Sequence, residues 1–183
     1  DLEWRMRPLS LLGGSAVFDV SGSPANGFFN SEVAVGAGGS ITLRNLSAAL
    51  PLIMFENAVR IPGLRGQLSV QIERLKLVAG RPEALEGSVD VADLLVPLLG
   101  RTPVGGFRAD FFTQNDGIIA SVEDTDGVVD LAGRLQINSD KSYSFLGQIV
   151  PKANTPDSLL QQIRYLPEGD RPGQRELRLD GSY

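Results

Sequence analysis

Residues 64–68 read Leu64-Arg65-Gly66-Gln67-Leu68, and this short pattern decides the fold. It places an apolar residue, any residue, a glycine, a polar or small residue and a second apolar residue in a row. The same pattern occurs at residues 12–16, 85–89, 131–135, 145–149 and 179–183. An alternation of period two predicts a strand with one buried face, and the glycine falls on that face.

A glycine on a buried strand face marks a bend, a bulge or a close approach of another group. Several strands with this feature predict one sheet that curves in the same sense along its length. The alternative is that these are ordinary glycines of a β-protein, each of which arose independently. We predict an all-β fold with a single curved, mostly antiparallel sheet.

The rest of the chain supplies the other strands and the turns between them. Asn115-Asp116-Gly117, Asp124 to Gly127 and Asn138 to Lys141 are typical hairpin connections, so we predict a meander of neighbouring antiparallel strands. The apolar phase of the strand at residues 64–78 changes after Glu73, and a bulge near Glu73-Arg74 would restore it. The predicted strands are residues 2–6, 14–20, 28–36, 40–46, 64–78, 83–91, 105–114, 117–123, 128–138, 142–150 and 174–183.

A few short helices complete the expected fold. We predict one over residues 47–57, with Ser47 as its N-cap, and one over residues 156–166. Both should cover the apolar concave face of the sheet or its ends. Residues 8–12 read as a single helical turn, and residues 92–99 read as a short helix or an apolar loop. The second helix has an apolar stripe of Leu159, Leu160, Ile163 and Leu166.

Composition limits the possible functions. The chain has 183 residues and no long linker, which indicates one domain, residues 1–183. It contains no His and no Cys, which excludes Ser-His-Asp and Cys-His catalysis and Cys/His zinc sites. The net charge is -5 and the basic residues are scattered, so we expect no nucleic-acid partner. We expect no cofactor and no catalytic or metal site.

Carboxylates are the remaining candidates for chemistry. Glu123, Asp124, Asp126 and Asp130 form the densest acidic cluster. They could bind Ca²⁺, but their spacing does not match an EF-hand loop, and Asp-Thr-Asp-Gly is typical of a tight turn. A glycosidase pair is a weaker alternative because no two carboxylates stand out. We therefore expect that the protein is not an enzyme.

The aromatic and aliphatic residues of the strands fill a core or line an apolar groove. The in-phase glycines favour the groove slightly, because missing side chains leave room for a helix or an acyl chain. The candidate groove or core-lining residues are Leu68, Val89, Phe107, Leu135 and Phe145.

The layout resembles the periplasmic region of the protein N family of the bacterial type II secretion system. The resemblance is carried, in order, by WRMRPLSLLGG at 4–14, PGLRGQL at 62–68, LEGSV at 85–89, DGVVDLAGRL at 126–135, KSYSFLG at 141–147 and LRLDGSY at 177–183. It implies a non-enzymatic accessory component in the periplasm of a Gram-negative bacterium. Such a component binds other type II secretion proteins during export of folded proteins across the outer membrane.

The resemblance also implies a single transmembrane helix upstream, which would anchor the domain in the inner membrane. The chain begins at Asp1 without an initiator Met, so we interpret it as an excised fragment. The glycine-containing strands are also similar to those of AsmA-like envelope proteins, which have curved sheets that bind or carry lipid. The second hypothesis is therefore a periplasmic lipid-binding or lipid-transfer module. We expect partner contacts at the first and last strands, the candidate edges of the sheet.

Overall fold

The long hairpin of strands β5 (Arg65–Val78) and β6 (Arg81–Leu95) lies at the centre of the computed structural model. Over residues 67–72 of β5 and their partners on β6, it follows the predicted alternation. Leu68 pairs with Val91 and Val70 pairs with Val89, so the apolar side chains of both strands share one face. The structure describes residues 2–7, 14–24, 26–36, 38–114 and 117–182.

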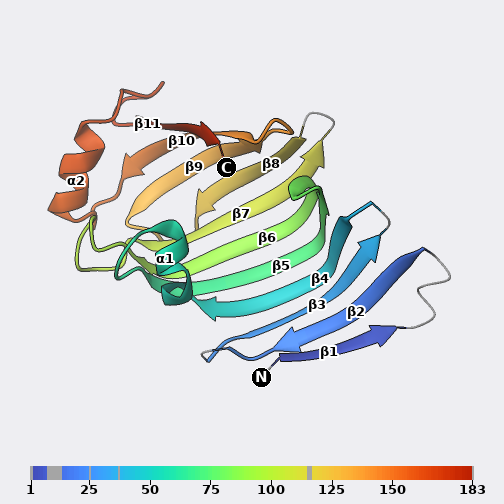
Figure 1. The fold of residues 1–183 in the computed structure, drawn as a ribbon. Coiled ribbons are helices and arrows are strands. Elements are labelled where there is room, and N and C mark those ends of the chain that lie inside the picture. Colours follow the sequence, from blue (N-terminus) through green and yellow to red (C-terminus); the bar gives the residue numbers. More distant parts are fainter. Residues whose placement is uncertain (1, 8–13, 25, 37, 115–116, 183) are drawn as a thin grey trace.

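Eleven strands form one antiparallel sheet in which each strand pairs with its neighbours along the chain. The sheet does not close, so β1 and β11 are its two edges (Figure 1). This confirms the predicted all-β fold with a single antiparallel sheet, and the predicted meander over residues 105–150. The other strands are β1 (Leu2–Arg7), β2 (Ser15–Gly22), β3 (Phe28–Gly36), β4 (Ser40–Pro51), β7 (Gly105–Gln114), β8 (Gly117–Asp124), β9 (Val129–Ile137), β10 (Ser142–Pro151) and β11 (Arg175–Ser182).

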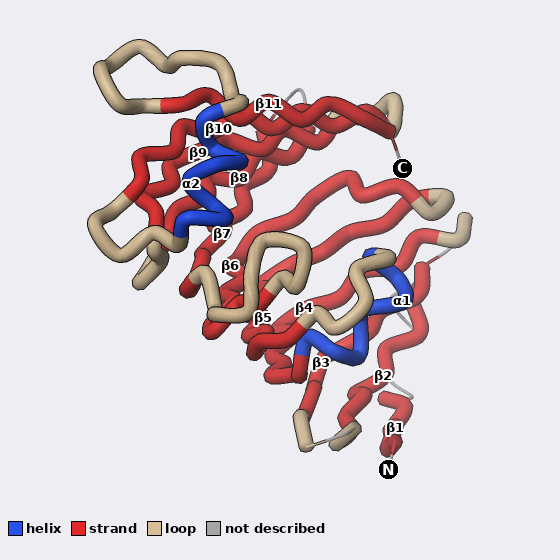
Figure 2. The backbone as a smooth tube through the Cα atoms, turned by 90° about the vertical axis from the view of Figure 1, so that its left-hand side faces the viewer, coloured by secondary structure: helices blue, strands red, loops and turns tan. Residues whose placement is uncertain are grey.

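The sheet is strongly curved, and Figure 2 shows its strands as an arc with β1 and β11 at the ends. We call the inner side of this arc the concave face and the outer side the convex face. The paired register places the apolar, glycine-containing positions on the concave face and mostly polar positions on the convex face. The short helical segments lie at one end of the strands, on the concave side (Figures 1 and 2).

The predicted bulge on β5 is confirmed. The β5–β6 register shifts between Ile72 and Arg74, which leaves Glu73 as the extra residue. A second bulge lies beside it on β4, where Asn45 has a left-handed backbone with φ 49°. Because of the extra residue, Leu75 pairs with Leu85 and stays on the concave face.

The predicted helix over residues 47–57 is wrong for its first half. Residues 47–51 continue β4, because Ala48 and Leu50 alternate and pair with Val70 and Leu68 of β5. Helical structure begins only after Pro51, as the 3₁₀ turn η2 (Leu52–Phe55) and the single α-turn α1 (Glu56–Val59). Ser47 is therefore a strand residue and not a helix cap.

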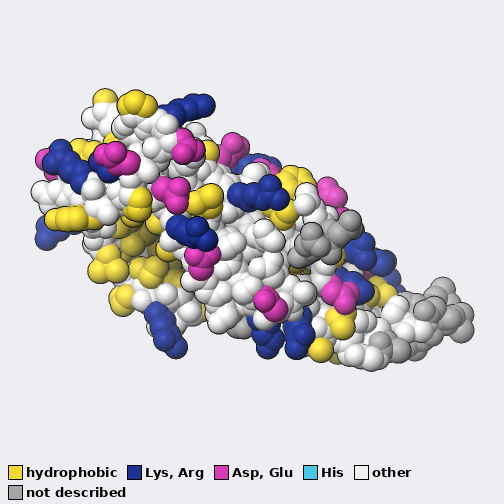
Figure 3. All heavy atoms as spheres, turned by 90° about the horizontal axis from the view of Figure 1, so that it is seen from above, with side chains coloured by type: hydrophobic (Ala, Val, Ile, Leu, Met, Phe, Trp, Pro, Cys, Tyr) yellow, Lys and Arg dark blue, Asp and Glu magenta, His cyan; other side chains and the backbone are white. Residues whose placement is uncertain are grey.

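The second helix is confirmed as α2 (Asp157–Arg164). Its buried residues Leu159 and Ile163 pack with Val104, Val129 and Ile149 in a small core at the helical end of the concave face. Hydrophobic side chains gather at this end of the molecule in Figure 3, on its left.

Two further predictions have mixed outcomes. Residues 92–95 continue β6 past a left-handed Asp93, and only residues 96–99 form the predicted apolar loop. The predicted helical turn at residues 8–12 and the hairpin tip at 115–116 lie outside the described residues.

Candidate functional site

The five candidate lining residues all lie on the concave face. Leu68 is on β5, Val89 on β6, Phe107 on β7, Leu135 on β9 and Phe145 on β10. Leu135 pairs directly with Phe145, whereas the other three lie on adjoining strands further along the arc. Each is half-buried. The period-two pattern thus predicts that these residues share one face of the sheet. It does not predict how much of that face is exposed to solvent.

The helical end of this surface is closed. Phe107 packs against the core cluster that Leu159 and Ile163 of α2 complete. The Ser158 hydroxyl and the Gln162 amide of α2 donate hydrogen bonds to the carbonyl oxygens of Leu99 and Leu98, at 2.9 and 3.3 Å. The helix and the loop at residues 96–104 are therefore held together over the ends of β7 and β9–β11.

The space above several in-phase glycines is filled by the chain itself. The Phe145 ring lies over Gly133 and Gly147, where an added Cβ would come within 2.6 and 2.7 Å of ring carbons. The Tyr143 ring covers Gly181 in the same way, and Leu52 of η2 covers Gly66. These glycines make room for neighbouring side chains of the same molecule.

The other end of the concave face is open. Trp4 of β1 makes an edge contact with Phe18, with ring centroids 6.2 Å apart, yet it remains 67% exposed. Leu2 is 66% exposed, and β1 has no described strand on its outer side. This end therefore combines an unpaired strand edge with accessible apolar side chains, which also include Met6, Val35 and Ile41.

The convex face beside β1 is polar and charged. Arg7 forms ion pairs with Asp19 at 2.7 Å and with Glu32 at 2.9 Å, and Glu32 also contacts Arg44 at 3.5 Å. The hydrogen bond to Asp19 and the charges of both carboxylates raise the pKa of Arg7 above its ordinary value. This row of charges crosses β1–β4 and stabilises their register on the solvent side only modestly, because the pairs are exposed.

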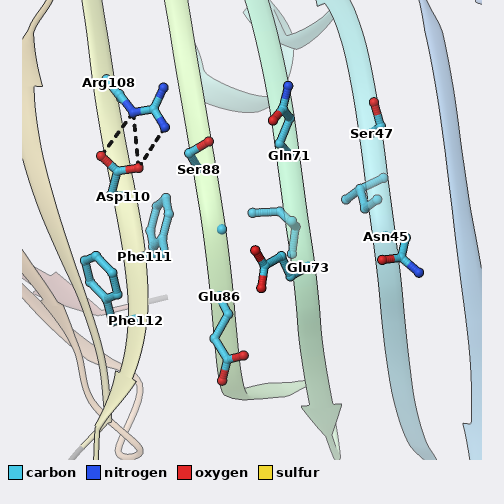
Figure 4. A pocket seen from close by; sticks show the side chains of 13 residues that line it. Asn45, Ser47, Gln71, Glu73, Glu86, Ser88, Arg108, Asp110, Phe111 and Phe112 are labelled. Atoms are coloured by element: carbon cyan, nitrogen blue, oxygen red, sulfur yellow. Dashed lines mark hydrogen bonds and ion pairs between the residues drawn. The ribbon is translucent and has the colours of Figure 1, made fainter.

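A hollow of about 670 Å³ lies on the convex face over β4–β7 (Figure 4). The two bulges border it, with Asn45 and Glu73 in its lining. The pattern around residues 64–78 predicted the bulge on β5, but the hollow itself was missed because it depends on the neighbouring bulge on β4. Its lining residues are Asn45, Leu46, Ser47, Gln71, Ile72, Glu73, Glu86, Gly87, Ser88, Arg108, Asp110, Phe111 and Phe112.

Arg108 is the positively charged residue that lines this hollow, and it forms ion pairs with two carboxylates of the protein. It donates hydrogen bonds to Asp110 at 3.0 Å and to Asp90 at 3.3 Å, seen in part in Figure 4. The hydrogen bond to Asp110 and the charge of Asp90 raise the pKa of Arg108. Two carboxylates thus neutralise the guanidinium.

The acidic cluster considered as a Ca²⁺ site forms hydrogen bonds and ion pairs within the protein. Lys152 contacts Asp124 at 2.7 Å and Asp130 at 3.0 Å, and the Leu131 N–H donates to Asp124 at 2.8 Å. Burial raises the pKa of Asp124, but these hydrogen bonds and the Lys152 charge outweigh it, so its pKa lies below the ordinary value. Asp126 accepts a hydrogen bond from the Gly106 N–H. No group of three or more potential ligands lies close enough to hold a metal ion within the described ranges.

None of the described helices is long and apolar enough to cross a membrane.

Comparison with known proteins gives one consistent result. Residues 1–178 match the family model described as type II secretion system (T2SS), protein N. The chain is also similar to type II secretion system protein N of Aeromonas hydrophila, with 24% identity over 98% of this chain and 73% of that protein. No solved structure matches this fold.

Proposed function

The chain belongs to the type II secretion system protein N family, and we propose that it serves this export machine as a non-enzymatic accessory component. The family is a secretion component and not a known enzyme family. In this proposal the domain lies in the periplasm of a Gram-negative bacterium, held by an inner-membrane helix upstream. It acts through contacts with other secretion proteins while folded proteins cross the outer membrane.

The observation that carries this proposal is the open edge at β1. All six residues of β1 are exposed, and its outer side has no strand partner among the described residues. Unpaired backbone groups at a sheet edge can take up a strand from another protein, and exposed side chains such as Leu2 and Trp4 add apolar contact. We place the main partner contact at this edge.

The test is a secretion assay in a strain that lacks the native gene and carries the full-length protein. Trp4→Lys puts a charge on the edge strand, where charged side chains block strand addition. We expect it to reduce secretion at least tenfold. Leu146→Lys is the matched control, because Leu146 is 49% exposed on the convex face of β10.

Because Trp4 contacts Phe18, urea denaturation is needed to show that the Trp4→Lys protein is still folded. Its urea midpoint should lie close to that of the parent. Since Trp4 lies on the edge strand and remains 67% exposed, we expect only a small change. A folded Trp4→Lys protein that supports full secretion would refute the edge as the contact site.

The second candidate function is lipid binding on the concave face. The observation that favours it is the open apolar end formed by Leu2, Trp4, Met6, Val35 and Ile41. The filled space above Gly133, Gly147 and Gly181 limits an acyl chain to the β1–β6 half of the face. Photo-crosslinkers at Leu68 and Val89 distinguish the two functions, because lipid would form small adducts there even when the other secretion genes are deleted.

A further inference from the structure

We propose that the helical end of the sheet lies on the surface of a membrane that contains anionic phospholipids. We call the surface that makes this contact the end patch. Its apolar part is Ile53, Val59, Leu98 and Tyr165, and its basic part is Arg60, Arg101 and Arg164. This inference rests on the proposed function, because it gives the periplasmic domain an orientation on the membrane that would anchor it.

The end patch is continuous, although its segments are far apart in the sequence. The turn after α1 contacts the loop at residues 96–104, because an added Cβ on Gly63 would lie 3.1 Å from the Pro97 side chain. The Ser158 and Gln162 side chains of α2 donate hydrogen bonds to the same loop. Figure 2 shows α2, α1 and the loops at this end of the strands facing the viewer. The three segments therefore present one common surface.

The apolar side chains of the end patch are unusually accessible. Leu98 is 78% exposed and Tyr165 is 90% exposed, while Ile53 and Val59 are each 50% exposed. Large apolar side chains that gather on a surface mark a contact with a protein or a membrane. Tyrosine combines an apolar ring with a hydroxyl group, and this suits the boundary between lipid headgroups and acyl chains.

The charges of the end patch favour a lipid surface that is negatively charged. Arg60, Arg101 and Arg164 are exposed, and none of them forms an ion pair with a described residue. The acidic residues of the three segments are Asp157 and Glu56, which accepts a hydrogen bond from the Gly63 N–H at 3.1 Å. The segments thus carry more positive than negative charge, whereas the whole chain has a net charge of -5.

A bilayer satisfies both parts of the end patch at once. Headgroup phosphates attract the arginines, and the region below the headgroups accepts the apolar side chains. Figure 3 shows hydrophobic and basic side chains together at this end of the molecule. A nucleic acid would neutralise the arginines but would leave the aliphatic side chains of Leu98 and Val59 in water.

The path of the chain brings the proposed anchor to the same end. Neighbouring strands are antiparallel, so each odd-numbered strand begins at the end where α1 leads into β5. The strand β1 therefore begins with Leu2 at the helical end (Figure 1). In the proposed function an inner-membrane helix precedes β1, and it would reach the domain from the side of the end patch. The anchor and the end patch then face the same membrane.

The test is flotation of the chain of residues 1–183 with lipid vesicles. We expect at least tenfold stronger binding to vesicles of phosphatidylethanolamine with phosphatidylglycerol than to vesicles of phosphatidylcholine. The triple variant Arg60→Gln, Arg101→Gln, Arg164→Gln should weaken binding to the anionic vesicles at least tenfold. Val59→Glu with Leu98→Glu should do the same, because it removes apolar contact and adds negative charge.

The matched control is the triple variant Arg74→Gln, Arg81→Gln, Arg134→Gln. These arginines are also exposed and form no ion pair with a described residue, but they lie outside the end patch. The control should bind the anionic vesicles within twofold of the parent. All variants change exposed residues, so their urea midpoints should stay close to that of the parent.

Binding that is equal for the two kinds of vesicle, or unchanged in the first triple variant, would overturn the inference. A photo-crosslinker at Leu98 of the full-length protein extends the test to cells, where we expect lipid-sized adducts even without the other secretion genes. Protein-sized adducts at Leu98 that require those genes would assign the end patch to a protein partner instead. Flotation needs no other secretion protein, so its failure is separate from failure of the β1 edge contact.

Discussion

At the scale of single residues, the concave face is shaped by aromatic rings that lie over glycines. Gly133 and Gly147 pair directly across β9 and β10, and together they leave the space that the Phe145 ring occupies. The sequence pattern predicted the glycines on this face, but not which side chain covers them. That requires the register between two strands, which a single strand pattern does not contain.

Gly147→Ala tests this packing. The new Cβ would lie 2.7 and 2.8 Å from ring carbons of Phe145, so the ring must move, and we expect a loss of about 1–3 kcal/mol in the free energy of unfolding. Urea denaturation measures it. Ala132→Val, which adds more atoms on the exposed convex side of β9, should be nearly neutral. Equal stability of Gly147→Ala and the parent would contradict the packing of Phe145 over this glycine.

Asp124 gives the protein a defined dependence on pH. Its pKa is lower in the folded protein than the roughly 3.9 of an unfolded Asp, so it contributes stability above that value. This stability begins to fall as the pH drops below about 4, and it is lost as the pH drops through the pKa of Asp124 in the folded protein. Asp124→Asn should therefore unfold at lower urea than the parent at pH 7, and the difference should shrink steadily below pH 4. A constant difference down to pH 2 would argue against this assignment.

At the scale of elements, the bulge on β5 keeps one apolar face continuous. Deletion of Glu73 removes the extra residue and forces Leu75 and Leu77 toward the convex face. Each exposed leucine costs about 1.5–3 kcal/mol, so we expect loss of cooperative unfolding in thermal melts. Deletion of Arg101, an exposed residue of the loop between β6 and β7, should be tolerated. A cooperative melt near the parent temperature after Glu73 deletion would show that the bulge is dispensable.

Helix α2 closes the core through two residues. Ile163 is 4% exposed and Leu159 is 8% exposed, whereas Leu160 of the predicted stripe is half-buried. Ile163→Ala should lower the free energy of unfolding by about 2–5 kcal/mol. Gln161→Ala, on the exposed side of the same helix, should change it by less than about 0.5 kcal/mol. Similar urea midpoints for the two variants would show that Ile163 of α2 is not packed in the core.

The elements differ in how well their sequences predicted them. Hairpins with strong turn residues, such as those bounding β8, were predicted almost to the residue. The helix over 47–57 was not, because Leu46, Ala48 and Leu50 fit both a strand and a short helix. Pairing with Leu68 and Val70 of β5 decides in favour of the strand.

At the scale of the whole molecule, the protein is an open arc with an apolar inner face and two edge strands, β1 and β11. Local patterns predicted the sheet, its curvature and the shared face of Leu68 and Leu135. They could not predict the strand order or the hollow over β4–β7, since both depend on registers between strands. The proposed function depends on this open architecture, because a closed sheet would offer no edge to a partner.

The most direct test of this account is photo-crosslinking in living cells with the full-length protein. The crosslinker is placed at Trp4 on the edge, at Val89 on the concave face of β6 and, as a control, at Arg134 on the exposed convex side of β9. We predict protein-sized adducts at Trp4 that disappear when other secretion genes are deleted, and few at Arg134. Lipid-sized adducts at Val89 that persist in those deletions, with no protein adduct at Trp4, would contradict the edge-contact account and favour lipid handling.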